Sequence, residues 1–182
     1  MIRILDLVFS LFGLILAVPL LLILYIVGLV DTGSPIFKQQ RVGRNQKPFT
    51  LIKFRTMQVN TASVASHLAS KNAITPFGRF LRKSKLDELP QLYNVLLGDM
   101  SLVGPRPGLF SQKDLTQARS AKNVYSMRPG ITGLAQVNNI DMSTPTLLAK
   151  TDKEMIDNFT LQTYFKYILM TVTGSGRGDR VK

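Results

Sequence analysis

Residues 7–30 read LVFSLFGLILAVPLLLILYIVGLV, a run of 24 residues without a charged side chain. As an α-helix this run is about 36 Å long, more than the roughly 30 Å hydrocarbon core of a bilayer. Its length and purity favour a membrane helix over a soluble-core helix or a cleaved signal peptide, whose apolar region is shorter. Pro19 lies in the middle of the run, where a proline bends or breaks a helix.

The proline leaves two topologies open. Either a bent helix spans the bilayer, or the chain enters, breaks at Pro19 and returns to the same face. Arg3 and Asp6 lie three residues apart just before the run, so the two side chains can pair at the headgroup layer and anchor the segment. The predicted organisation is a membrane segment over residues 1–31, a folded domain over 32–173 and a glycine-rich basic tail over 174–182.

The charge is strongly uneven along the chain. Lysine and arginine total 23 against 11 acidic residues, a net charge of +12, and residues 32–86 contain basic residues but no acidic one. Such a stretch suits phosphate groups of nucleic acid, anionic lipid or substrate, and it predicts a cytoplasmic domain. The chain has no cysteine and one histidine, His67, in a predicted loop. Disulfide scaffolds, zinc–thiolate sites and thiol nucleophiles are therefore excluded, leaving carboxylates, basic groups and a bound metal for chemistry.

The rest of the pattern predicts an α+β fold that is mostly helical, with interfacial amphipathic helices. Phe77, Phe80 and Leu81 have helical spacing between basic residues, which is typical of a helix lying on a membrane surface. The other predicted elements are short strands at 36–40 and 49–57, a polar turn at 41–45, a loop or weak helix at 59–75, irregular chain at 101–107, and helices over 109–126 and 144–173.

Asp87 and Glu88 are the first acidic residues after the basic stretch. Pro90 is tolerated only in a first turn, so a helix is predicted to begin at this pair and end at Gly98. The pair either caps that helix or forms a metal-and-phosphate site, in which one carboxylate serves as nucleophile or metal ligand.

Two arginines stand beside prolines, Arg106 in Pro-Arg-Pro and Arg128 in Arg-Pro-Gly. A proline-held arginine loses less entropy on binding and suits a planar phosphate clamp. The alternative is an ordinary surface group or an ion pair with a core carboxylate.

Five ordered blocks carry a family resemblance: SPIFKQQRVG at 34–43, FTLIKFRTM at 49–57, LDELPQLYNV at 86–95, GDMSLVGPRP at 98–107 and RPGITGLAQVN at 128–138. Together with Arg3-x-x-Asp6 and the proline-interrupted helix, they resemble the bacterial sugar transferases. These are the monotopic phosphoglycosyl transferases that begin lipid-linked glycan assembly. The chain resembles the minimal catalytic form, without the extra N-terminal transmembrane helices of larger members.

The resemblance implies a catalytic domain on the cytoplasmic face of the bacterial inner membrane, anchored by a re-entrant helix that breaks at Pro19. It implies transfer of a phospho-sugar from a UDP-sugar to undecaprenyl phosphate with release of UMP, as a first step toward O-antigen, exopolysaccharide or another surface glycan. An N-acetylated hexose or deoxyhexose is the sugar expected from the family.

The resemblance also implies roles for individual residues. Asp87 is implied as the nucleophile, through an acyl-phosphate, and as a ligand of the required Mg²⁺, with Glu88 as its dyad partner. The expected substrate- and phosphate-binding residues are Lys53, Arg55, Arg82, Arg106, Arg128 and Gln136.

Three positions depart from the family pattern. Val18 replaces a serine before the proline and bears on the break angle, whereas Asn139 in place of glycine and Tyr164 in place of an acid bear on sugar choice or local packing. Two other functions stay open, a membrane-tethered polyanion-binding protein without catalysis and a direct glycosyltransferase that releases UDP. Nucleic acid is not an expected partner, because the alternating aromatic and basic pattern of a single-strand binder is missing. A homo-oligomer is left open.

Overall fold

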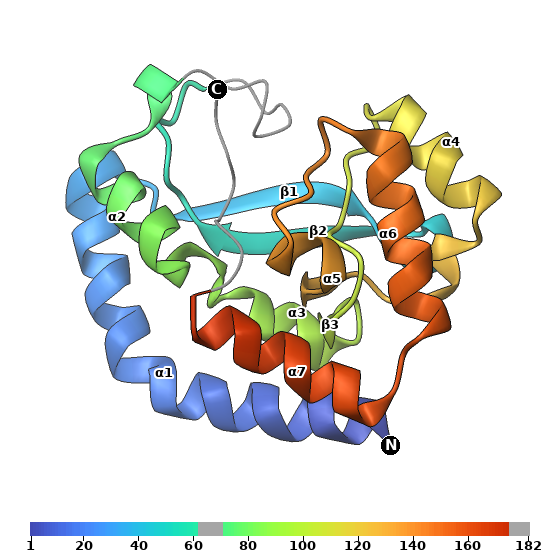
Figure 1. Cartoon of the computed structure of the whole chain (residues 1–182). Helices are drawn as coiled ribbons and strands as arrows, with labels where there is room; N and C mark the ends of the chain where they lie inside the picture. Colours follow the sequence, from blue (N-terminus) through green and yellow to red (C-terminus); the bar gives the residue numbers. More distant parts are fainter. Residues whose placement is uncertain (62–70, 175–182) are drawn as a thin grey trace.

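The structure, a computed structural model, describes residues 1–61 and 71–174 (Figure 1). His67 and most of the loop predicted at 59–75 lie outside the described residues, as does the tail after Gly174.

The first element is a single long helix, α1 (Ile2–Thr32), with Pro19 inside it. Figure 1 shows α1 changing direction sharply between its first and second halves, as expected for an internal proline. The helix ends at Gly33, whose positive φ of 71° is the usual left-handed stop, and the Gly33 N–H donates to the Leu29 carbonyl at 2.9 Å. The helix therefore continues through Asp31 and Thr32, two residues beyond the apolar run.

The burial pattern of α1 is the reverse of that in a soluble amphipathic helix. Asp6 and Ser10 are buried, whereas Ile4, Phe12 and Ile23 are each more than half exposed. Among the described residues, α1 is the one helix long and apolar enough to cross a membrane, and only 11% of its most apolar stretch is buried. An apolar face this large without protein contacts fits a helix embedded in lipid.

Arg3 and Asp6 reach different partners rather than each other. Arg3 donates to two backbone carbonyls at the far end of a later helix, from Nη2 to Leu96 at 3.2 Å and from Nη1 to Met100 at 3.4 Å. A guanidinium is favourable at the negative end of a helix, so tertiary packing takes Arg3 away from the expected ion pair.

Asp6 is 2% exposed and accepts three hydrogen bonds at its Oδ1. The donors are the Ser101 hydroxyl, the Leu102 N–H and the Tyr164 hydroxyl, each at 3.0 Å. Burial, followed by the nearby Asp6 carboxylate, raises the pKa of the Tyr164 phenol, which therefore stays a donor. Tyr164 thus takes part in local packing, fastening the start of α1 to the last helix.

Two small sheets follow α1. β1 (Ile36–Val42) and β2 (Pro48–Phe54) form an antiparallel hairpin around the short helix η1 (Arg44–Gln46), with Ile36 opposite Phe54. β1 runs further than predicted, so Arg41 is a buried strand residue and not part of the turn. The strand continues because Arg41 and Val42 pair with Phe49 and Pro48 of β2.

The second sheet corrects the prediction of irregular chain at 101–107. β3 (Ser101–Val103) pairs in parallel with β4 (Gly130–Thr132), and the irregular chain begins only at Gly104. The two strands approach closely, because a Cβ on Gly130 would stand 2.0 Å from the Gly104 nitrogen. Two of the proline-containing motifs are therefore joined through this sheet.

The remaining elements are helical: η3 (Lys71–Ala73), α2 (Pro76–Ser84), η4 (Leu86–Glu88), α3 (Gln91–Leu97), α4 (Lys113–Ala121), η5 (Val124–Ser126), α5 (Leu134–Val137), α6 (Pro145–Asp157) and α7 (Leu161–Val172). The amphipathic helix predicted at 77–83 is confirmed as α2. The helix predicted over 109–126 is shorter, and that over 144–173 is two helices. Thr160 separates them by capping α7, accepting from the Thr163 N–H at 3.2 Å.

α3 is central to the fold, since it packs against both α1 and β2 (Figure 1). One core cluster joins the hairpin to the α3 region through Phe49, Leu51, Val95 and Met100. The turn η4 comes immediately before α3, so the packing of this helix determines where Asp87 and Glu88 lie.

Candidate active site

Asp87 and Glu88 lie in the 3₁₀ turn η4 and not at the start of an α-helix. The α-helix begins three residues later, at Gln91, with Pro90 as its N-cap. The N-caps of η4 and α3 are Lys85 and Pro90, and neither makes a side-chain capping hydrogen bond. Asp87 and Glu88 therefore lie in the first turn of η4 and are not N-cap residues.

The two carboxylates have different surroundings, as expected for adjacent helical residues that point in different directions. Asp87 is 4% exposed, and the side chain of Glu88 is 14% exposed. Arg106 Nη2 donates to Glu88 Oε1 at 2.7 Å, a short charge-assisted hydrogen bond. The structure therefore brings together three of the residues selected from sequence.

Two buried arginines hold the Pro-Arg-Pro loop in place. Arg119 donates from Nη1 to the Arg106 carbonyl at 2.8 Å, and it forms a buried ion pair with Asp152 in which Nη2 and Oδ2 are 2.7 Å apart. Arg41 donates from Nη1 to the Pro107 carbonyl at 3.2 Å. The sequence did not reveal these supports, because Arg41 falls in the predicted polar turn at 41–45, and Arg119 and Asp152 are 33 positions apart.

Lys53 and Arg55 flank an aromatic ring on the hairpin, beside the site. Both lie near the Phe37 ring, with Lys53 Nζ at 5.7 Å and Arg55 Cζ at 5.5 Å from its centroid. Arg55 also donates from Nε to the Ser34 carbonyl at 2.7 Å. β2, which carries Lys53, packs against η4, which carries the two acids.

α2 brings further cations to the same turn. Arg82 Nε donates to the Thr56 hydroxyl at 2.8 Å. Lys85 connects α2 to η4, and its pKa is lowered from the ordinary value. Partial burial is the main cause; the Glu88 carboxylate partly offsets it, and the positive charge of Arg106 lowers the pKa further. The turn therefore carries two acids within a strongly cationic region.

Gln136 lies near the arginine loop, whereas Arg128 lies elsewhere. Gln136 Nε2 donates to the Gly104 carbonyl at 3.2 Å, and its buried Oε1 accepts no hydrogen bond from the described residues. Arg128 donates from Nε to the Gly98 carbonyl at 2.9 Å, at the end of α3 opposite η4. Of the predicted substrate-binding residues, Arg106 therefore contacts η4 through Glu88, and Arg128 lies at the opposite end of α3.

The carboxylates on η4 are oxygen donors of the kind that Mg²⁺ binds together with substrate phosphates. No group of three or more histidine, cysteine or acidic side chains lies together in residues 1–61 and 71–174. Mg²⁺ commonly binds one or two carboxylates together with substrate phosphates and water, so such a group is not required. Asp87 supplies a carboxylate, while Glu88 already holds Arg106.

Comparison with known proteins now gives the family. The model of the bacterial sugar transferase family matches residues 1–177. The chain belongs to this family. The resemblance carried by the five sequence blocks is therefore confirmed over nearly the whole chain.

Several curated members are similar to this chain. It is 39% identical to an uncharacterized sugar transferase of Bacillus subtilis, over 93% of this chain and 84% of the relative. It is 38% identical to a UDP-glucose:undecaprenyl-phosphate glucose-1-phosphate transferase of Caulobacter vibrioides, over 93% of this chain and 67% of the relative. An undecaprenyl-phosphate galactose phosphotransferase of Salmonella typhimurium is 39% identical over 87% of this chain, which spans only 37% of that longer protein.

Proposed function

We propose that this family member transfers a phospho-sugar from a UDP-sugar to undecaprenyl phosphate and releases UMP. The observation that carries the proposal is the Glu88–Arg106 contact at 2.7 Å beside the buried Asp87, within a cationic region. The names of the related enzymes support the same class of reaction. A purely polyanion-binding protein has no need for two acids on such a surface.

The reaction we propose has two steps at the sugar-linked phosphorus. An Asp87 carboxylate oxygen attacks this phosphorus, the bond to the bridging oxygen breaks, and UMP leaves with that oxygen. A phosphate oxygen of undecaprenyl phosphate then attacks the same phosphorus, and the Asp87 carboxylate leaves. Because Asp87 is 4% exposed, donor binding has to make its carboxylate accessible.

The surrounding side chains have separate tasks in this proposal. Glu88 holds Arg106 beside the reacting group, and Arg106 with the cations of β2 and α2 balances the charge of the phosphates. The buried Gln136 Oε1, which accepts no hydrogen bond from the described residues, becomes an acceptor for the substrate only if substrate binding exposes it. Asp87 would hold a Mg²⁺ ion, which supplies charge neutralisation at the phosphates when bound.

The anchor determines how the site meets its lipid substrate. We propose that α1 is re-entrant, entering and leaving on the cytoplasmic face of the inner membrane, because it bends sharply in the middle and exposes apolar side chains along its length. The phosphate of undecaprenyl phosphate lies at the headgroup layer, so a domain resting on that face can reach it.

A panel of UDP-sugars tests the reaction class. Purified protein is incubated with undecaprenyl phosphate and UDP-linked N-acetylhexosamines, N-acetylated deoxyhexoses, glucose or galactose, and the nucleotide product is identified. We expect UMP, with an N-acetylated sugar as the preferred donor. UDP as the product indicates a direct glycosyltransferase, and a lack of turnover with every donor contradicts the proposal.

A further inference from the structure

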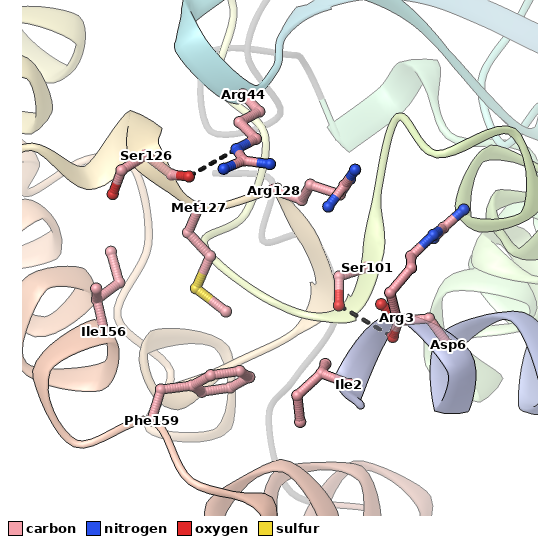
Figure 2. A pocket seen from close by; sticks show the side chains of 10 residues that line it. All are labelled: Ile2, Arg3, Asp6, Arg44, Ser101, Ser126, Met127, Arg128, Ile156 and Phe159. Atoms are coloured by element: carbon pink, nitrogen blue, oxygen red, sulfur yellow. Dashed lines mark hydrogen bonds between the residues drawn. The ribbon is translucent and has the colours of Figure 1, made fainter.

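A cationic pocket lies at the opposite end of α3 from the two acids. It is a cavity of about 350 Å³ between the start of α1, β3 and the segment before β4 (Figure 2). Three arginines line it, Arg3, Arg44 and Arg128. Apolar side chains, among them Met127 and Phe159, form another part of the wall. The lining therefore combines positive charge with an apolar surface.

Two of these arginines are held in a way that leaves their terminal nitrogens available. Arg44 Nε donates to the Ser126 carbonyl at 2.8 Å, and Arg128 Nε donates to the Gly98 carbonyl at 2.9 Å. Within the part of the chain that the structure describes, neither side chain uses Nη1 or Nη2 for a hydrogen bond or ion pair. Figure 2 shows the two guanidinium groups in the upper part of the pocket. A guanidinium fixed through Nε presents its fork to an oxyanion at little further entropic cost.

The charge of the pocket favours an anion. Arg3 adds a third positive charge, although its nitrogens donate to backbone carbonyls. Asp6 also lines the cavity, and its Oδ1 already accepts three hydrogen bonds. Three positive charges against one negative charge leave an excess of two, which suits a phosphate group.

The location argues against the reacting phosphate of the donor. Ten residues separate Glu88 from Gly98, which is on the order of 15 Å along a helical path. The pocket instead adjoins the first turn of α1, where the outward apolar surface begins with Ile4, 65% exposed. A phospholipid whose headgroup lies at this level places its phosphate beside the arginines. The apolar part of the same lipid then lies beside the apolar wall of the pocket.

We propose that this pocket binds the phosphate group of an anionic membrane phospholipid, seating the first turn of α1 at the headgroup layer. The site is separate from the proposed catalytic centre, and its occupancy does not depend on the transfer reaction. It gives Arg128 a partner other than the substrate phosphate predicted from sequence.

Lipid binding to the full-length protein in an uncharged detergent tests the proposal. Dioctanoyl phosphatidylglycerol is titrated by native mass spectrometry, with dioctanoyl phosphatidylcholine and inorganic phosphate as separate arms. We expect one saturable phosphatidylglycerol molecule per chain and weaker phosphatidylcholine binding. The double variant Arg44→Gln/Arg128→Gln should bind about tenfold more weakly or worse, because two charge-assisted contacts are lost.

Matched variants separate the pocket from general charge. Lys113→Gln/Lys150→Gln removes two exposed charges elsewhere, and its affinity should stay within about twofold of wild type. Arg44→Lys/Arg128→Lys keeps the charge without the fork and should still weaken binding, which covers the case in which the glutamine variant fails to fold. The proposal is overturned if the Arg44→Gln/Arg128→Gln and Lys113→Gln/Lys150→Gln variants lose equal affinity. It is also overturned if Arg44→Lys/Arg128→Lys binds the lipid as tightly as wild type. Displacement of the lipid by equimolar inorganic phosphate overturns the lipid as ligand.

Discussion

Replacing Arg119 with methionine should strongly destabilise the domain. The side chains of Arg119 and Asp152 are 2% and 1% exposed, and Nη2 and Oδ2 are 2.7 Å apart. Removing one partner of a buried pair leaves the other charge uncompensated, which costs about 3–5 kcal/mol in free energy of unfolding. For a domain of this size the loss corresponds to a fall in melting temperature on the order of 10 °C. The lost hydrogen bond to the Arg106 carbonyl adds to this effect.

Thermal unfolding in detergent measures this change, and Arg119→Lys separates stability from positioning. Lysine can still pair with Asp152, but it lacks the second nitrogen that reaches the Arg106 carbonyl. We expect the melting temperature of Arg119→Lys to be much closer to wild type than that of Arg119→Met. Its turnover should nevertheless be slower than that of wild type, with the loss in kcat. If the free energy of unfolding of Arg119→Met is within about 1 kcal/mol of the wild-type value, the ion pair does not stabilise the domain as argued.

Three further substitutions test the anchor and the site. Tyr164→Phe removes one of three donors to the buried Asp6 and should cost about 1–3 kcal/mol in thermal unfolding, so an unchanged melting temperature contradicts the proposed fastening of α1. Arg106→Ala should lower turnover by about 10²-fold or more with the fold and membrane retention intact, since it removes the cation held by Glu88, and near-wild-type activity would make Arg106 structural only. A cysteine at position 2, in place of Ile2, should react with a membrane-impermeant thiol reagent only from the cytoplasmic side of intact cells, and labelling from the periplasmic side would show a spanning helix.

The parts of the fold that were predictable depend on local patterns. A charge-free run with a central proline predicts α1 and its bend, and helical spacing of phenylalanines predicts α2. In both cases a few neighbouring residues carry the information. For Arg106 the sequence left open an ion pair with a core carboxylate, and the structure gives Glu88, 18 positions away, as the partner.

The parts that were missed depend on contacts between distant segments. β3 and β4 have three residues each, too few for a periodic pattern, and the two prolines after β3 obscured the strand. Arg3 and Asp6 suggested a local pair, but burial against β3 and the end of α3 gave each a different partner. The start of α3 after Pro90 is similarly set by the tight turn that precedes it.

The open forks of Arg44 and Arg128 were also beyond the sequence. Arg44 belongs to the basic stretch at 32–86, and Arg128 was predicted as a phosphate clamp, with an ordinary surface group or an ion pair as the alternative. Their anchoring through Nε depends on backbone carbonyls of η5 and the α3 C-terminus, which come near only in the folded chain.

The intact mass of the protein after incubation with its UDP-sugar, without undecaprenyl phosphate, tests the central claim most directly. We predict a mass increase of one phospho-sugar, a burst of UMP equal to the enzyme present, and loss of the adduct when the lipid is added. Asp87→Asn, nearly identical in shape, should show neither adduct nor burst. Release of UMP only when both substrates are present, with no adduct on the wild-type protein, would contradict a covalent step at Asp87.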